Sequence, residues 1–262
     1  MRCILFCEAR ADAETAQFLV GEALCHRVEW LREHRDASTW ESVGVSWCVD
    51  EAERMRSWFD LHSVDAYLRR LGVKPLHGHI GGRAAEPGAK LLSNIDRLVR
   101  RLRQRGGDAA EVEAVLVVWD ADNQARARAA GLDQSLAMVD QTASRWVLGM
   151  PTPMREAWVL VGFEPQSDAE HTVLAGLRRS LGFEPCVQPE RLTSTDATSA
   201  RHPKMVLSAL IGDDADRERL CLRIGSEARW QRLTTVGAGC GLAEFLRRIV
   251  TVLGPAFEGP RE

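Results

Sequence analysis

Several features that would assign a function at once are missing from the sequence. It has no apolar run near the roughly 18 residues of a membrane span, and its start shows no charged leader followed by an apolar segment. Its seven cysteines form no CxxC pair, which argues against a zinc knuckle and against a disulfide framework. No GxxxxGKS or GxxxxGKT phosphate loop occurs, so the chain is not a P-loop nucleotidase by itself. These absences predict a cytoplasmic protein with reduced, mostly buried thiols.

A basic excess is missing as well. The formal net charge is -3, with 34 Lys and Arg against 37 Asp and Glu. A nucleic-acid partner would therefore have to be held by a local patch rather than by the surface as a whole. With 45% hydrophobic and 27% charged residues, the 262-residue chain has the composition of an ordinary globular protein. Its length suits one large α/β domain, or a domain of typical size with an elaboration.

The most informative segment is Ala114–Gln124, which reads AVLVVWDADNQ. An apolar run without alternation predicts a strand buried on both faces, as in the middle of a parallel α/β sheet. Asp120 and Asp122 follow this strand, at the edge where open α/β sheets bind ligands. Two carboxylates this close repel each other unless they are solvated or a cation neutralises them, and a hard ion such as Mg²⁺ is the obvious candidate. The alternative is that Asp122 or Asn123 merely caps the following helix.

A second apolar run, Cys3–Cys7, ends at Glu8 and predicts another buried strand with a carboxylate at its carboxyl end. If the two strands are neighbours, Glu8 converges with Asp120 and Asp122. The other interpretation is that Glu8 is a solvated turn residue. Further along, two prolines precede an apolar helix whose first turn contains Glu156, as a helix-stabilising residue, a metal ligand or both.

The remaining pattern predicts an α/β fold in which helices flank a mostly parallel central sheet and a helical extension follows. Helices are expected over residues 12–25, 50–71, 90–105, 124–144, 171–181, 203–211, 215–224 and 242–253, and further strands over 43–49 and 145–149. The helix over 90–105 carries five arginines on its polar face, which either grip phosphates or simply face solvent. Lys204 lies at a helix start, where a lysine opposes the helix dipole, and this favours a role for it. In the glycine-rich segment 77–88, His77 and His79 lack a third ligand at useful spacing.

Three separated features occur in one order: Glu8 after the first strand, Asp120 and Asp122 after a later strand, and the Glu156-Ala157-Trp158 triplet after two prolines. In these features residues 1–161 resemble a TOPRIM domain, the metal-binding α/β module of topoisomerases, primases and OLD-family nucleases. The chain looks most similar to stand-alone bacterial TOPRIM-like proteins that are encoded beside ATPases, often in anti-phage loci. Those proteins carry a Pro-Lys pair near their C-terminal helices, like residues 203–204 here. The resemblance implies a TOPRIM-like domain over residues 1–165 and a helical extension over 166–262.

The resemblance implies a nuclease that depends on Mg²⁺ or Mn²⁺ and acts on DNA or RNA. Glu8, Asp120 and Asp122 would hold the metal, and Glu156 would complete the shell or orient water. Lys204 or Arg83 would stabilise charge on the phosphate oxygens.

The resemblance also implies a partner, an ABC-like or SMC-like ATPase. Its expected contact surface is the helical extension, with Trp230, Arg247 and Arg248, although a helical layer that completes the monomer's own core is an alternative. Tyr67 is the single tyrosine and lies in an expected helix, so no covalent topoisomerase mechanism is expected. Two rival functions remain. One is a catalytically degenerate TOPRIM-like binding or regulatory subunit, and the other is a receiver-like or phosphatase-like domain phosphorylated on Asp120.

Overall fold

The structure is a computed structural model that describes residues 1–35, 40–50, 55–77, 88–122, 124–139 and 143–258. The chain divides into two compact units that are each discontinuous in sequence. The first unit contains residues 1–13, 36–119 and 124–148, and the second contains 14–35, 120–123 and 149–262. The sequence interpretation assumed a single boundary near residue 165, and that assignment of domains stays a prediction.

The first unit is built on a five-stranded sheet, which confirms the α/β class with a mostly parallel sheet. Its strands are β1 (Arg2–Cys7), β2 (Ser46–Trp47), β3 (Phe59–Asp60), β4 (Ala114–Val118) and β5 (Arg145–Gly149). The order is β2-β1-β4-β5, with β3 also paired to β1, and β1 is parallel to β2, β3 and β4. The Arg145 amide bonds to the Glu113 carbonyl, so β4 and β5 begin at the same end, as parallel strands do. All five residues of β4 are buried, as the unbroken apolar run predicts.

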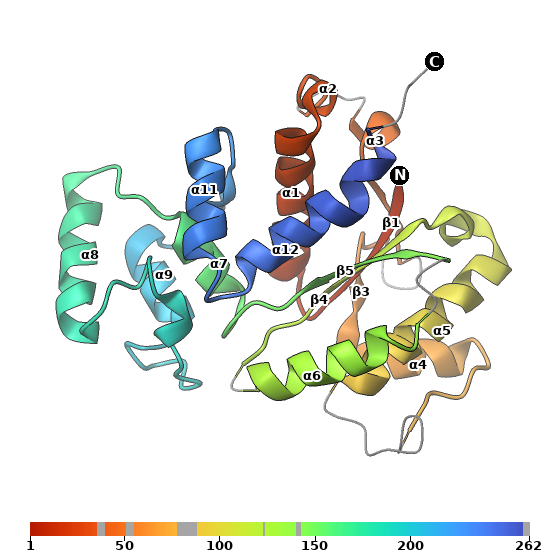
Figure 1. Cartoon of the computed structure of the whole chain (residues 1–262). Coiled ribbons are helices and arrows are strands. Elements are labelled where there is room, and N and C mark those ends of the chain that lie inside the picture. Colours follow the sequence, from red (N-terminus) through yellow and green to blue (C-terminus); the bar gives the residue numbers. More distant parts are fainter. Residues whose placement is uncertain (36–39, 51–54, 78–87, 123, 140–142, 259–262) are drawn as a thin grey trace. The chain divides into compact units, whose positions relative to one another are not determined.

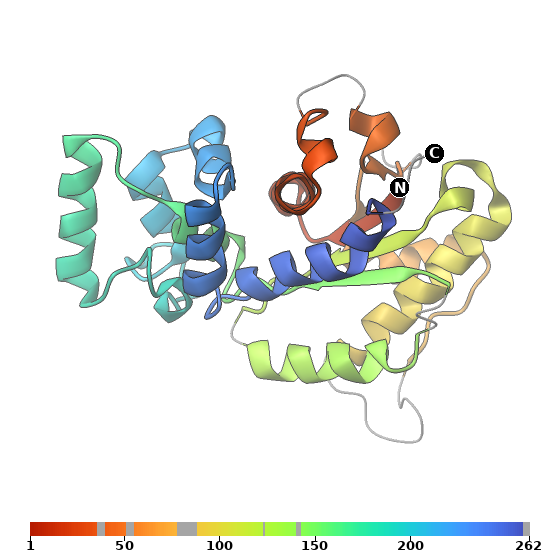
Figure 2. The ribbon, with the colours of Figure 1, turned by 45° about the horizontal axis from the view of Figure 1, so that its top comes forward.

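The three longest helices of the first unit lie beside one another on one side of this sheet, as both views show (Figures 1 and 2). They are α4 (Val64–Arg70), α5 (Ala89–Arg105) and α6 (Ala125–Leu136), and shorter elements are α3 (Trp40–Val43), η2 (Leu61–Ser63) and η3 (Gly107–Glu111). On α5 the side chains of Leu92, Ile95 and Leu98 are fully buried. The helix expected over residues 90–105 is therefore confirmed.

The helix expected over residues 50–71 is wrong in its first half. Residues 51–54 lie outside the described part, and Phe59 and Asp60 form strand β3 beside β1. The Phe59 ring lies 5.4 Å from the Phe6 ring, so a tertiary contact outweighs the local helical spacing. Asp60 then starts the helical part, because its carboxylate accepts hydrogen bonds from the His62 amide at 2.9 Å and the Ser63 hydroxyl at 2.7 Å. The strand expected over 43–49 is likewise reduced to Ser46–Trp47.

The second unit is helical, and its centre is helix α7. Its elements are α1 (Arg10–Arg27, which enters this unit at Glu14), α2 (Glu29–Arg32), α7 (Arg155–Gly162), α8 (Asp168–Leu181), η4 (Pro189–Arg191), α9 (Pro203–Ile211), α10 (Ala215–Leu222), α11 (Glu227–Val236), α12 (Leu242–Arg248), η5 (Ile249–Leu253) and η6 (Gly254–Ala256). Every residue of α7 is buried, and α9, α10 and α11 pack around it. Among the described residues, no helix has the length and apolar character needed to cross a membrane.

Candidate functional site

Glu8 lies at the edge of the first unit's sheet where β1 ends. The pairing of Phe6 with Val117 aligns the ends of β1 and β4, so Glu8 stands level with Trp119. The Trp119 indole Nε1 donates a 3.1 Å hydrogen bond to Glu8 Oε1, and His62 Nε2 lies 3.2 Å from the same oxygen. The Glu8 side chain is 20% exposed, whereas that of His62 is 71% exposed. The Glu8 carboxylate is therefore fixed by contacts with Trp119 and His62 at the end of β1, and Glu8 is not a freely solvated turn residue.

His62 is a site residue that the sequence did not reveal. It belongs to η2, directly after β3, and β3 pairs with β1 over Phe6 and Cys7. This pairing brings His62 to the end of β1, where it meets Glu8. The only usable signal in the sequence was Asp60 two residues earlier, a residue type that favours caps and turns.

Asp120 and Asp122 belong to the second unit, in a segment held against the prolines that precede α7. The Ala121 amide donates to the Pro151 carbonyl at 2.8 Å, and the Asp122 amide donates to the Pro153 carbonyl at 2.7 Å. Asp120 Oδ1 accepts a 3.1 Å hydrogen bond from the backbone amide of Arg155, the first residue of α7. A carboxylate here satisfies a free amide and complements the helix dipole. Asp120 thus stabilises the start of α7.

Asp122 is not the cap residue of the helix that follows β4. Helix α6 begins after Gln124, whose side chain makes no capping hydrogen bond. Asp122 has a φ of 47°, in the left-handed region, which aspartate tolerates better than most residues. Asn123 lies outside the described residues. The capping alternative is therefore wrong for Asp122, and for Asn123 it stays a prediction. A different acidic residue, Asp120, bonds to the first amide of α7.

Glu156 lies in a buried network of ionic hydrogen bonds. Arg155 and Glu156 are both buried, and Arg155 Nη2 lies 3.3 Å from Glu156 Oε1. Arg155 Nη1 also donates to Glu218 Oε2 at 2.6 Å and to the Thr15 hydroxyl at 3.2 Å. One guanidinium thus joins α7, α10 and α1, so Arg155 and Glu156 contribute to the stability of the second unit.

The structure shows no contact of the other predicted residues with Glu8 or Asp120 within the described part of the chain. Lys204 is exposed in the first turn of α9, where its amide donates to His202 Nδ1 at 3.3 Å. His77 is exposed, and His79 and Arg83 lie outside the described residues. In the part of the chain that the structure describes, no group of three or more His, Cys, Asp or Glu side chains is arranged to hold a metal ion. The convergence of Glu8 with Asp120 and Asp122 stays a prediction.

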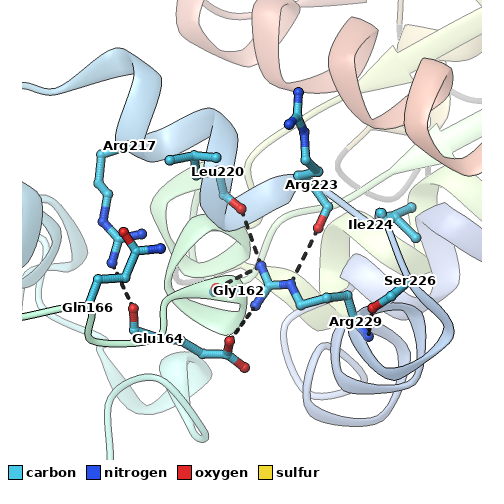
Figure 3. A pocket seen from close by; sticks show the side chains of 10 residues that line it. Gly162, Glu164, Gln166, Arg217, Leu220, Arg223, Ile224, Ser226 and Arg229 are labelled. Atoms are coloured by element: carbon cyan, nitrogen blue, oxygen red, sulfur yellow. Dashed lines mark hydrogen bonds and ion pairs between the residues drawn. The ribbon is translucent and has the colours of Figure 1, made fainter.

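A cavity of about 260 Å³ in the second unit contains none of the predicted residues (Figure 3). Arg229 crosses it and donates to the carbonyls of Gly162 at 2.9 Å and Cys221 at 2.6 Å. Arg217 donates to the Glu164 carbonyl at 2.7 Å. These arginines satisfy carbonyls at and just beyond the C-terminal end of α7 and in the last turn of α10, and they carry the charge that a helix C-terminus favours. The cavity therefore surrounds a structural arginine cluster.

The side chains expected at a partner contact make contacts with other residues of the second unit. The Trp230 ring stacks on the His26 ring, with centroids 4.6 Å apart. Arg247 and Arg248 both bond to Glu244, each at 2.6 Å in its closest contact. By contrast, α8 buries only Leu181 of its 14 residues. Helix α8 therefore offers a more exposed surface for a partner than the surroundings of Trp230, Arg247 and Arg248 do.

Comparison of the chain with protein-family models, with curated proteins and with solved structures finds no match. The resemblance to TOPRIM domains therefore stays a prediction that rests on the order of the acidic motifs in the sequence.

Proposed function

We propose that this protein is a divalent-metal-dependent nuclease with a TOPRIM-like metal site, which hydrolyses phosphodiester bonds of DNA or RNA. The observation that carries the proposal is the register of β1 and β4. These strands are parallel neighbours, paired from Cys3 with Ala114 to Phe6 with Val117. Glu8 follows the first strand, and Asp120 follows the second after one intervening residue, Trp119. Parallel α/β sheets bind ligands at this edge.

The donor atoms fit a hard divalent cation. Glu8, Asp120 and Asp122 supply carboxylate oxygens, which Mg²⁺ and Mn²⁺ prefer. When bound, such an ion polarises the phosphodiester and lowers the pKa of water. The chain's own contacts orient two of the proposed ligands, since Trp119 and His62 contact Glu8 and the Arg155 amide bonds to Asp120. Contacts of this kind normally fix the direction of ligand oxygens.

A nuclease assay with matched variants tests the proposal. Plasmid DNA, single-stranded DNA and RNA are incubated with the protein in Mg²⁺, in Mn²⁺ and in EDTA. Asp120→Asn is the informative change, because asparagine caps a helix as well as aspartate does but is a poor metal ligand. The control is Asp213→Asn, on an exposed residue of the second unit. The proposal requires cleavage that depends on the metal and is lost in Asp120→Asn and Glu8→Gln but not in the control, and full activity in Asp120→Asn would refute it.

We further propose that the protein works with an ATPase of the ABC or SMC-like type, as an effector in a bacterial antiviral defence system. The chain has no phosphate loop of its own, and its net charge of -3 gives it little general attraction for nucleic acid. The exposed helix α8, with Val173 38% exposed, supports a contact in the second unit. Co-expression with the neighbouring gene, followed by size-exclusion chromatography, checks this. If the protein elutes without the co-expressed partner and also cleaves nucleic acid at the full rate by itself, the partner proposal is wrong.

A second candidate function is a binding or regulatory subunit in which the acidic residues are structural. The capping bond of Asp120 to the Arg155 amide and the buried ion pair of Glu156 favour it. Both candidates share the fold, so stability does not separate them. A purified protein that binds nucleic acid but neither cleaves it nor binds Mn²⁺ would identify the second.

A further inference from the structure

Positive charge is concentrated in one continuous segment of this acidic protein. Residues 64–105 contain ten Lys and Arg but three Asp and Glu. The whole chain has a net charge of -3, so the rest of the chain carries an excess of ten negative charges. A segregation of this size creates a local positive potential that the net charge hides.

Six of these ten side chains lie on α4, just after it or on the outer part of α5, within the described residues. Arg69 and Arg70 are exposed at the end of α4, and Lys74 is exposed just after it. Arg101 and Arg105 are exposed on α5, where the opposite side of the helix is buried. We call the surface formed by Arg69, Arg70, Lys74, Arg97, Arg101 and Arg105 the α4–α5 face.

Hydrogen bonds hold the two parts of the α4–α5 face together. Arg97 Nη1 donates to the Lys74 carbonyl at 2.7 Å. Asn94 Nδ2 donates to Asp65 Oδ1 at 2.9 Å, and the Leu76 amide donates to Asn94 Oδ1 at 2.8 Å. Figures 1 and 2 show α4 and α5 side by side. Helix α4, the segment that follows it and α5 are therefore tied together, and together they carry these basic side chains.

Acidic partners on this surface are few. Asp96 pairs with Arg100 at 2.8 Å, and Asp65 lies 3.9 Å from Arg69. Within the described residues, the side chains of Lys74, Arg101 and Arg105 contact no carboxylate. Like charges four residues apart destabilise an isolated helix, which works against the helix propensity of arginine and against the favourable place of Arg105 in the last turn.

We propose that the α4–α5 face binds the phosphate backbone of a nucleic-acid strand. Arg97, Arg101 and Arg105 are spaced four residues apart, so they form a row with a rise of about 6 Å per step. Such an exposed row contacts the backbone and not the base edges, so binding is independent of sequence. Helix α4 follows directly on η2, which contains His62, whereas Arg101 and Arg105 lie at the end of α5 that leads through η3 to the start of β4.

The role of the bound strand as a substrate rests on the proposed nuclease function, but the binding itself does not. The test variant is Lys74→Gln/Arg101→Gln/Arg105→Gln. Its control is Arg178→Gln/Arg179→Gln/Arg219→Gln, which removes the same charge from α8 and α10 in the second unit. Binding of labelled duplex and labelled single strand is measured in EDTA by fluorescence anisotropy over a range of salt concentrations, and circular dichroism confirms that both variants are folded.

The proposal predicts that the test variant binds duplex DNA about tenfold or more weakly than wild type, with a less steep dependence of log K on log salt. Three lost phosphate contacts lower that slope by about 2.7, since each contributes about 0.9 on duplex DNA. The control variant keeps the wild-type slope. The proposal is overturned if the test variant keeps the slope, if both variants lose it equally, or if wild type binds anionic lipid vesicles but no nucleic acid. If binding behaves as predicted but the protein cleaves no nucleic acid, the proposed nuclease function is refuted and the proposed binding by the α4–α5 face is supported.

Discussion

Replacing Arg155 with methionine removes the centre of the buried network in the second unit. The Arg155 side chain is 8% exposed and that of Glu156 is 7% exposed, so Glu156 would be left as a buried carboxylate without its cation. Breaking a buried ion pair in this way costs about 3–5 kcal/mol. Glu218 is 27% exposed and regains some contact with water, which favours the lower end of that range. We therefore expect Arg155→Met to lower the free energy of unfolding by about 3 kcal/mol.

Urea unfolding followed by circular dichroism measures this loss. The control is Arg247→Met, because Arg247 also pairs with a glutamate, Glu244, but the two side chains are 60% and 46% exposed. Hydrogen bonds from Arg247 lower the pKa of the Glu244 carboxyl, yet an exposed pair contributes at most about 1 kcal/mol. Adding Glu156→Gln to Arg155→Met should restore part of the loss, because it removes the unpaired charge. A loss in Arg155→Met no larger than in Arg247→Met would refute the buried-network interpretation.

Three further predictions follow from individual contacts. Asp120 accepts a hydrogen bond from the first amide of α7, so Asp120→Ala should lower the unfolding free energy by about 1 kcal/mol, whereas Asp120→Asn should stay close to wild type in urea titrations. Gly162→Ala should cost about 1–3 kcal/mol or more, because the added methyl group would overlap the Cys221 carbonyl, whereas Gly176→Ala on the open surface of α8 should raise the melting temperature through a gain of about 0.5–1 kcal/mol. Equal effects of the two glycine changes would contradict this. Burial raises the pKa of the Cys186 and Cys240 thiols from the ordinary thiol value of 9.0 to about 12. As the pH rises, these thiols ionise in the unfolded chain before they ionise in the folded protein. The folded state therefore keeps its full stability below about pH 9 and loses stability as the pH rises toward about 12. The unfolding midpoint should therefore be lower at about pH 10 than at neutral pH, and a fast reaction of native thiols with a disulfide reagent would show that they are not buried.

The parts of the fold that the sequence predicted correctly are those with a strong local pattern. The unbroken apolar runs gave β1 and β4, and their lack of alternation indicated strands buried on both faces. Helices α5 and α9 match the expected ranges closely because their apolar residues recur at helical spacing. For the candidate site, the position of Glu8 at a strand end followed from the same reasoning.

The parts that the sequence did not predict depend on contacts between distant residues. Strand β3 has two residues and exists because it pairs with β1, so no periodicity marks it or the resulting approach of His62 to Glu8. The bond from the Arg155 amide to Asp120 spans 35 residues, and the bond from Arg155 to Glu218 spans 63. Helix α11 was missed although Ser226 is its cap, a signal that the sequence does contain.

Direct titration with Mn²⁺, followed by electron paramagnetic resonance, tests the central claim that Glu8, Asp120 and Asp122 form a divalent-metal site. It is carried out on wild type, Glu8→Gln, Asp120→Asn, Asp122→Asn and the control Asp213→Asn. The account predicts that wild type and the control bind Mn²⁺ and that each of the other three variants loses this binding while remaining folded. Wild type that binds no Mn²⁺, or variants that bind it as tightly as wild type, would contradict the account.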